Sequence, residues 1–368
     1  MWVIGGILIY LAVARDMEPS LLLPMGFGAI LVNLPMSGAI TQYINQFVEG
    51  TLKTNIEVGV LDELYAAGIA NELFPLLLFI GIGAMIDFGP LLANPKMLFF
   101  GAAAQFGIFF TFSLASLLGF TPQDAASISI IGAADGPTSI FVANYFDSKY
   151  IGAIIVAAYS YMALVPIIQP PVIKMVTTKA ERRIHMHYKQ KDVSRLIRIL
   201  FPIIVTVVAG LFAPRSVALV GFLMFGNLIR ECGVLNSLSN SAQKELANLI
   251  TLLLGITVAV NMQAAKFLNP ETLMILGLGL FAFVFDTVGG VLFAKAMNLF
   301  LKEKINPMIG ATGISAFPMS ARVIAKMATE EDPSNHILMH AVSANVSGQI
   351  ASVIAGGLVI KLVEGLIK

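Results

Sequence analysis

Long apolar stretches separated by short polar ones run from one end of the chain to the other. Many of them reach about 18 residues or more, which is enough for a helix to cross a hydrocarbon core about 30 Å thick. The runs are continuous, whereas the strands of a membrane barrel alternate apolar and polar positions. The pattern therefore predicts an all-α polytopic membrane protein. Predicted spans cover residues 1–14, 20–36, 71–88, 97–119, 125–146, 150–175, 196–212, 215–231, 246–264, 271–298, 305–327 and 336–366.

Composition and charge agree with a membrane protein. Of the 368 residues, 57% are hydrophobic and 12% are charged, about half the charged share of a soluble domain. The net charge of +1 gives no reason to expect a nucleic-acid partner. Cys232 is the single cysteine, so the chain forms no internal disulfide. No phosphate-binding glycine motif occurs, so we expect no direct use of ATP.

Two stretches are more polar than the rest. Residues 39–70 carry acids and amides, and we favour a helix lying in the membrane interface there, with a loop as the alternative. Residues 177–195 are the most basic part of the chain. The positive-inside rule therefore predicts that they form a cytoplasmic loop, which is also a candidate surface for a cytoplasmic partner. The basic side chains of this loop are Lys179, Arg182, Arg183, Lys189, Lys191 and Arg195.

The basic loop separates two halves with similar patterns, residues 1–176 and 196–368. In transporters, duplicated halves are often inverted relative to each other, and the binding site lies where their interrupted helices meet. We therefore predict two structurally similar, inverted repeats, each with an interrupted helix. The matching stretches are 76–100 with 252–276 and 130–143 with 308–321.

Asp135 is the most unexpected residue in a predicted span, within "IIGAADGPTSIFVA". A carboxylate at bilayer depth costs at least about 2.5–3.5 kcal/mol on insertion scales and usually has a function. Gly136 and Pro137 interrupt the helix and free backbone carbonyls. With the hydroxyls of Thr138 and Ser139, these oxygens suit a hard cation. Two interpretations remain open: an ion or proton site, or an Asp that caps the next helix.

The matching stretch of the second half, "NPMIGATGISAFPMSAR" at 306–322, is also rich in glycine and proline but contains no carboxylate. Arg322 at its end could pair with a substrate carboxylate or an acid of the other half, or could snorkel at a helix end. For Ser347 and Ser352, in a Ser- and Gly-rich stretch, we favour a role in close helix packing. Other polar side chains inside predicted spans are Tyr159, Tyr161, Asp286 and Asn345.

Four motifs together resemble the membrane β subunit of the sodium-pumping biotin-dependent decarboxylases, the family of the oxaloacetate, methylmalonyl-CoA and glutaconyl-CoA enzymes. The resemblance covers essentially the whole chain. The compact length favours the acyl-CoA enzymes over the oxaloacetate enzyme. The motifs are "GAMIDFGPLLANP" at 83–95, "IGAADGPTSIF" at 131–141, "NPMIGATGISAFPMSARV" at 306–323 and "HAVSANVSGQIASVIAGG" at 340–357.

The resemblance implies a function and a set of partners. A carboxyltransferase α subunit would load a biotin on a biotin carrier subunit, and this chain would decarboxylate the carboxybiotin, consume a proton and export Na⁺. A small membrane γ/δ subunit, a homo-oligomer such as a trimer, and a bacterial inner-membrane location are also implied. The chain has no Met-Lys-Met sequence, which agrees with a partner of biotin and not its carrier.

The resemblance also implies roles for individual residues. Asp135, Asn306, Gly310, Ser315 and Asn345 would serve Na⁺ binding, Tyr161 and Ser315 proton movement, and Arg322 the carboxybiotin or the ion path. From the residues alone, a Na⁺-coupled secondary transporter or Na⁺/H⁺ antiporter remains the competing function, because it would use the same duplicated, interrupted-helix layout.

Overall fold

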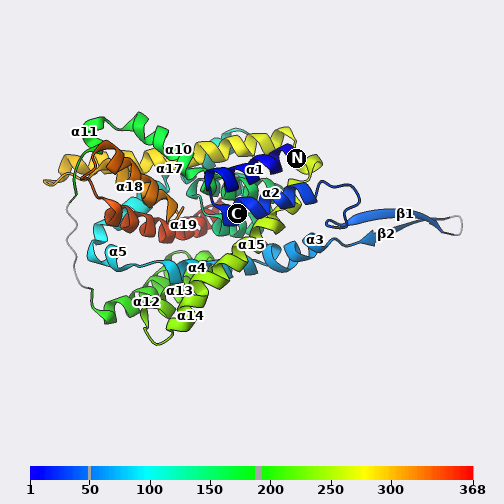
Figure 1. Cartoon of the computed structure of the whole chain (residues 1–368), viewed down its shortest axis with the longest axis horizontal. Coiled ribbons are helices and arrows are strands. Elements are labelled where there is room, and N and C mark those ends of the chain that lie inside the picture. The colour runs from blue at the N-terminus through cyan, green and yellow to red at the C-terminus, as the bar shows by residue number, and fades with distance from the viewer. Residues whose placement is uncertain (49–50, 187–192, 368) are drawn as a thin grey trace.

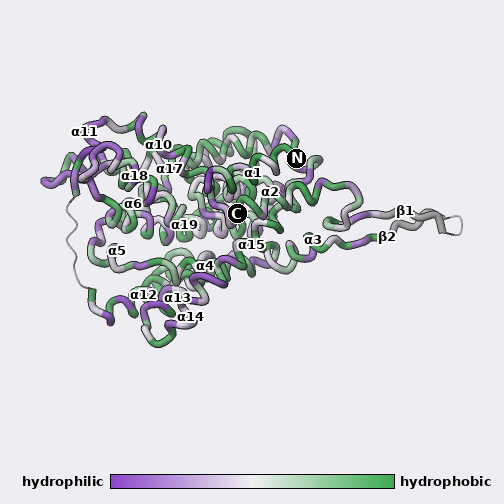
Figure 2. Tube along the Cα trace, in the orientation of Figure 1, coloured by the Kyte–Doolittle hydropathy of each residue, from purple (hydrophilic) through white to green (hydrophobic). Residues whose placement is uncertain are grey.

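The structure is a computed structural model that describes residues 1–48, 51–186 and 193–367. Helices make up nearly all of it, and apolar residues dominate them through the middle of the body (Figures 1 and 2). Among the described residues, six helices are long and apolar enough to cross a membrane. The predicted all-α polytopic class is confirmed. The six are Pro95–Leu117 (η2, α6 and α7), Ile151–Val176 (α10), Arg195–Phe212 (α12), Asn236–Met262 (α14, η5, α15 and η6), Pro270–Phe300 (α17) and Leu338–Ile367 (α19).

Several predicted spans are shorter or bent helices. The predicted span 71–88 falls on α4 (Leu73–Met85), which forms a bent pair with residues Val60–Ala70 at an angle of 59° and would make a seventh span with them. The predicted spans 125–146 and 305–327 are both interrupted. The shorter helices are α1 (Trp2–Arg15), α2 (Pro19–Leu31), α5 (Gly89–Ala93), α13 (Val217–Glu231) and α16 (Ala264–Phe267), with the 3-10 turn η4 (Pro214–Ser216).

The helices pack in two neighbouring groups. One group consists of α1, α2, α4, α12, α13 and α15, in which α2 packs on α1 and α15 and α13 packs on α4 and α12. The other consists of α6, α7, α10, α17 and α19 and surrounds the two interrupted helices. Glycines allow the closest approaches: a Cβ on Gly83 of α4 would lie 1.8 Å from the carbonyl oxygen of Leu223 of α13. The interrupted helices are therefore enclosed by the second group.

The predicted interfacial helix at 39–70 is wrong for most of its length. Strands β1 (Gln42–Val48) and β2 (Thr51–Glu57) pair antiparallel, with Gln42 opposite Glu57 and Val48 opposite Thr51. The hairpin projects from the body (Figure 1). The stretch "QYINQFVEGTLKTNIEV" is rich in β-branched and aromatic residues, which favour strands. Helix begins only at α3 (Val60–Tyr65) and continues through η1 (Ala66–Ala70).

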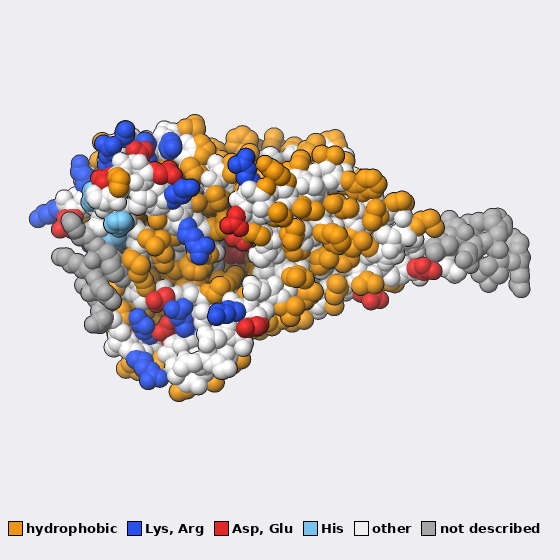
Figure 3. All heavy atoms as spheres, in the orientation of Figure 1, with side chains coloured by type: hydrophobic (Ala, Val, Ile, Leu, Met, Phe, Trp, Pro, Cys, Tyr) orange, Lys and Arg blue, Asp and Glu red, His pale blue; other side chains and the backbone are white. Residues whose placement is uncertain are grey.

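The basic segment lies at the end of the body opposite the hairpin, where lysine and arginine side chains gather (Figures 1 and 3). Thr178 caps the short helix α11 (Lys179–Arg182) through a capping box with Glu181. The half-buried pair Arg182–Glu331, 2.6 Å apart, joins this segment to α18, and the Arg182 hydrogen bond holds the pKa of Glu331 below its usual value. Lys189 and Lys191 of the predicted loop lie outside the described residues.

The interruption that was predicted in each half is present. In the first half it separates α8 (Pro122–Ser129) and η3 (Ile130–Ala133) from α9 (Gly136–Tyr145). In the second half it separates η7 (Pro307–Gly313) from α18 (Met319–Glu331). In each half the interrupted segment is followed by one long helix, α10 or α19. The inverted relation of the two halves stays a prediction.

Candidate functional site

The first interruption follows from local sequence. Ala134 adopts a left-handed conformation with φ 51°, and Asp135 follows in an extended one. Pro137 occupies the first turn of α9, where a backbone N–H would have no acceptor within the helix. Asp135 therefore caps a helix that begins inside the protein.

The two interruptions meet. The backbone N–H of Ser315, in the gap between η7 and α18, donates to the carbonyl oxygen of Ala133 at 3.0 Å. The end of η3 and the residues after η7 are thus in direct backbone contact. This contact places the polar atoms of both halves at one point, as the duplicated pattern predicted.

The carboxyl group of Asp135 lies at this meeting point and is only 4% exposed. Its Oδ1 accepts the backbone N–H of Thr138 at 3.3 Å, and its Oδ2 accepts the Thr138 hydroxyl at 2.7 Å. Oδ2 also accepts the hydroxyl of Ser352 of α19 at 3.0 Å. The capping interpretation is confirmed, but a cap does not need a hydroxyl from a helix 217 residues away. Asp135 is at once a cap and a contact between the two halves.

Serine and amide side chains of α19 complete the cluster. The Ser315 hydroxyl contacts the Ser352 hydroxyl and donates to the carbonyl of Gly348 at 3.1 Å. Gln349 donates its side-chain amide to the carbonyl of Ser315. The Asn345 Nδ2 donates to the carbonyl of Ile314 at 2.7 Å. The Asn345 Oδ1 is buried and has no partner among the described residues.

The cluster lies at membrane depth. Ser352 is close to the middle of α19, which spans Leu338–Ile367, so it is about 21 Å from either end at 1.5 Å per residue. The middle of a helix that crosses a core about 30 Å thick lies near its midplane. Irregular backbone is tolerated there only when protein surrounds it or it lines a cavity. The surrounding helices of the second group meet that condition.

The two tyrosines of α10 lie in different environments. The Tyr161 hydroxyl donates to the carbonyl of Leu276 in α17 at 2.5 Å, and it does not contact Asp135. The ring of Tyr159 lies directly against Gly136, where an added Cβ would be 2.2 Å from the ring. Its hydroxyl is buried without a partner among the described residues. Of the two, Tyr159 is the nearer to the meeting point, whereas the resemblance implied a role for Tyr161.

The other residues expected from the resemblance lie away from Asp135. Asn306 caps η7 and donates to the carbonyls of Arg182 and Ile184 at 2.8 and 3.0 Å, so it holds the basic segment. Gly310 is in backbone contact with Gly290 of α17. Arg322 is exposed on α18. The structure thus brings Asp135, Ser315 and the Asn345 region together and leaves these three residues outside the cluster.

Asp286, the second buried acid, is fully buried near the middle of α17. Its Oδ1 accepts the backbone N–H of Ile108 at 3.2 Å, just after the break between α6 and α7. Its Oδ2 lies beside Gly132 and has no hydrogen-bond partner among the described residues. The same N–H also donates to the carbonyl of Gln105 at 3.2 Å, so the carboxylate is a second acceptor in the first turn of α7.

The residues at the meeting point suit an alkali cation. They offer one carboxylate and the hydroxyls of Thr138, Ser315 and Ser352. The unpartnered Asn345 oxygen belongs to a residue about 10 Å from Ser352 along α19. Hard cations prefer such oxygen ligands. Transition metals favour His and Cys, and no group of three His, Cys, Asp or Glu that could hold a metal occurs within residues 1–48, 51–186 and 193–367.

Comparison with known proteins places this chain in a family. A family model described as the Na⁺-transporting oxaloacetate decarboxylase beta subunit matches residues 1–363. The methylmalonyl-CoA decarboxylase subunit beta of Veillonella parvula is 47% identical over 99% of this chain and 92% of its own length. The glutaconyl-CoA decarboxylase subunit beta of Acidaminococcus fermentans is 45% identical over 99% and 93%. The oxaloacetate decarboxylase beta chain of Klebsiella pneumoniae is 42% identical over 99% and 94%.

Proposed function

Because the chain belongs to the β subunits of the Na⁺-transporting decarboxylases, it is part of a sodium-translocating decarboxylase, and we propose that it decarboxylates carboxybiotin and exports Na⁺ through the Asp135 cluster. The observation that carries the proposal is the buried Asp135 carboxylate at the junction of two interrupted helices, held by Thr138 of one half and Ser352 of the other. Such a junction at membrane depth is typical of ion sites in transporters.

The chemical step needs a proton and a poorly solvated place. The bond between the ureido nitrogen of biotin and the carboxyl carbon breaks, and its electron pair returns to nitrogen. The nitrogen takes up one proton, and CO₂ leaves. A less polar environment than water favours loss of the charged carboxylate. No nucleophile is required of the protein, so its work is to bind the carboxybiotin, deliver the proton and couple the step to ion movement.

Sodium is the cargo in this scheme. The ionised Asp135 and the surrounding neutral oxygens would replace the hydration shell of Na⁺. Export of one cation against 100 mV costs about 2.3 kcal/mol, so a decarboxylation that releases several kcal/mol is able to drive one or two ions. Entry of a proton would neutralise the carboxylate and favour release of Na⁺ to the far side.

The contacts between the two halves provide a means of coupling. Asp135 and Ala133 belong to the first interrupted helix, and Ser315 to the second. Carboxybiotin and Na⁺ can be coupled only if both favour the same one of two conformations. Breaking and remaking the contacts of Ser315 with Ala133 and of Ser352 with Asp135 would open the site to one side or the other.

The remaining subunits follow from the same proposal. A carboxyltransferase α subunit would load biotin on a carrier subunit, and the carrier would approach the end of the body with the basic segment. A small membrane γ/δ subunit, a homo-oligomer such as a trimer, and the bacterial inner membrane are proposed with it. Arg322 is proposed to act near the carboxybiotin or the ion path, and Tyr161 and Ser315 to move the proton. Exposure of Arg322 on α18 is compatible with binding a ligand that arrives from outside.

The test is the decarboxylation of carboxybiotin by the purified complex, with and without Na⁺, for wild type and Asp135→Asn. We expect Na⁺ to accelerate the wild type and Asp135→Asn to lose this stimulation, because an amide cannot replace the charge. If carboxybiotin disappears equally fast without Na⁺ in the wild type, a plain Na⁺ transporter is the better function. If Na⁺ accelerates the wild type and Asp135→Asn equally, the function stands and the ion site lies elsewhere.

A further inference from the structure

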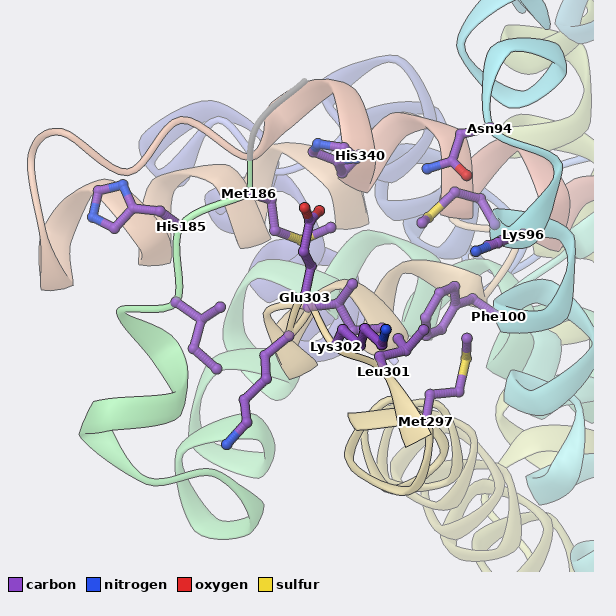
Figure 4. A pocket seen from close by; sticks show the side chains of 14 residues that line it. Asn94, Lys96, Phe100, His185, Met186, Met297, Leu301, Lys302, Glu303 and His340 are labelled. Carbon is purple, nitrogen blue, oxygen red and sulfur yellow. The ribbon is translucent and has the colours of Figure 1, made fainter. Parts of the chain in front are cut away.

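A large cavity lies at the end of the body that carries the basic segment. It has a volume of about 900 Å³, within the range of small-molecule pockets. Three segments line most of it, and Met297 of α17 and His340 of α19 complete the lining. The segments are residues 94–100 before and within α6, residues 184–186 after α11, and residues 301–305 between α17 and η7. Figure 4 shows side chains of all three segments around one space. The cavity is distinct from the Asp135 cluster, none of whose residues line it.

Positive charge prevails in the cavity. Lys96, Lys302 and Lys304 line it, with Glu303 as the only acid of the lining. These lysines form no salt bridge with an acid in the part of the chain that the structure describes. Lys96 belongs to the segment 94–100, and Lys302 to the segment 301–305 (Figure 4). Exposed lysines without acidic partners, arranged around a concave surface, favour an anionic ligand.

The cavity also has an apolar part. Met97, Phe100, Met297 and Leu301 line it beside the lysines, and Phe100 and Met97 are buried. A ligand that combines an anionic head with an apolar ring system or chain fits such a lining better than a bare inorganic anion does.

One wall of the cavity is firmly held. The side-chain amide of Asn306 donates to the carbonyls of Arg182 and Ile184, and Asn335 donates to the same two carbonyls at 3.3 and 3.2 Å. The Arg182–Glu331 ion pair fixes the same segment to α18. These contacts therefore fix the wall formed by residues 184–186 in place, and Asn306 provides two of them.

The buried lining residues Met97 and Phe100, which form the floor of the cavity, are connected to the Asp135 cluster by hydrogen bonds. The Ser347 hydroxyl donates to the carbonyl of Met97 at 2.9 Å and accepts the backbone N–H of Gly101 at 3.0 Å. The next residue of α19, Gly348, accepts the Ser315 hydroxyl, which contacts Ser352 beside Asp135. A ligand that moves residues 97–101 thus acts on the backbone that carries the cation ligands.

We propose that this cavity receives the carboxylated ureido head of biotin, with Lys96 and Lys302 pairing with the carboxylate and the apolar floor contacting the ring and chain. The inference rests on the proposed function, because it assumes that carboxybiotin is the substrate. It adds a location, and it assigns positioning work to Asn306, which holds the wall. The apolar side chains beside the lysines keep water from the ureido head, and loss of hydration favours departure of CO₂.

The experiment uses the purified complex with its biotin carrier subunit. The variant Lys96→Gln/Lys302→Gln removes two charges from exposed positions without changing side-chain length greatly, so we expect it to fold. The concentration of carboxylated carrier that gives half-maximal decarboxylation should rise by roughly tenfold or more, since a hydrogen bond to a charged group accounts for about a tenfold change in affinity. The half-saturating Na⁺ concentration should change less than twofold. Lys244→Gln, at an exposed position outside the cavity, is the matched control.

A second variant tests the space itself. Leu301→Trp adds bulk at a half-buried lining position and leaves every charge in place. It should slow decarboxylation of both the carboxylated carrier and free carboxybiotin. If the rate falls only with the carboxylated carrier, the lysines and the cavity serve only to dock the carrier protein. The proposal is overturned if the double lysine variant behaves like Lys244→Gln or if Leu301→Trp leaves free carboxybiotin turnover unchanged. Sodium stimulation in the wild type would still support the proposed function in either case.

Discussion

Replacement of Ser352 by alanine should weaken Na⁺ binding selectively. The Ser352 hydroxyl donates to Asp135 Oδ2 at 3.0 Å and lies beside the Ser315 hydroxyl, which keeps the Gly348 carbonyl as an acceptor at 3.1 Å. The substitution therefore removes one hydrogen bond to the carboxylate and one oxygen from the cluster, without leaving the Ser315 hydroxyl unpaired. Asp135 retains both contacts with Thr138.

The size of the effect follows from these contacts. A hydrogen bond to a charged group contributes about 1.5–3 kcal/mol, and about 1.4 kcal/mol corresponds to a factor of ten in an equilibrium constant. The half-saturating Na⁺ concentration should therefore rise at least roughly tenfold. Because loss of the donor also favours the neutral form of the carboxyl group, competition by protons should increase. The rate at saturating Na⁺ should fall much less.

The assay is a Na⁺ titration of carboxybiotin decarboxylation by the purified complex, repeated by equilibrium binding of radioactive sodium. Ser343→Ala is the matched control, because this buried serine is on the same helix and donates only to its own helix, to the Met339 carbonyl at 2.8 Å. Equal Na⁺ curves for Ser352→Ala and Ser343→Ala would refute the reasoning. So would a fall in maximal rate with no change in the Na⁺ requirement.

Two further predictions concern residues that the resemblance connects with Na⁺. Gly310→Val should lower the thermal unfolding midpoint of the complex, because a Cβ there would lie 2.0 Å from the Gly290 carbonyl oxygen. Overpacking of this kind costs about 1–3 kcal/mol or more. The control Gly277→Ala should be neutral or slightly stabilising, because a Cβ at Gly277 would meet no neighbouring atom within 4 Å. Asn306→Ala should raise the half-saturating concentration of carboxylated carrier several-fold. It removes two hydrogen bonds, to the carbonyls of Arg182 and Ile184, at about 1 kcal/mol each. The half-saturating Na⁺ concentration should stay within about twofold of the wild-type value. A large Na⁺ shift for Asn306→Ala would instead favour a direct role in ion binding.

The hairpin illustrates the limit of reading a polar stretch by composition. Acids and amides in residues 39–70 suggested a surface helix, but the β-branched and aromatic residues between Gln42 and Glu57 favour strands. Both periodicities place polar residues on an exposed side, so the pattern alone does not decide between them. Pairing of the two strands with each other decided it.

Ser352 shows the corresponding limit for the site. Its sequence context, rich in serine and glycine, favoured helix packing, and no local signal connects it with Asp135 217 residues earlier. Its position seven residues after Asn345, and therefore on nearly the same side of α19, is the one clue that could have found it. Sequence reasoning favoured Tyr161 over Tyr159 for the same reason: the two are only two residues apart, but they point to nearly opposite sides of α10 and face different neighbours.

The sequence by itself determined the class of protein, the position of the six long helices, the two interruptions and the place of a carboxylate, Asp135, in the first of them. These follow from local physics: about 20 apolar residues are needed to cross lipid, proline and glycine end helices, and a buried carboxylate requires partners. Only the tertiary structure decided which partners those are. Contacts such as Ser315 with Ala133, Ser352 with Asp135 and Asn306 with Ile184 join segments far apart along the chain. They depend on how helices pack around the interruptions, which no local pattern encodes.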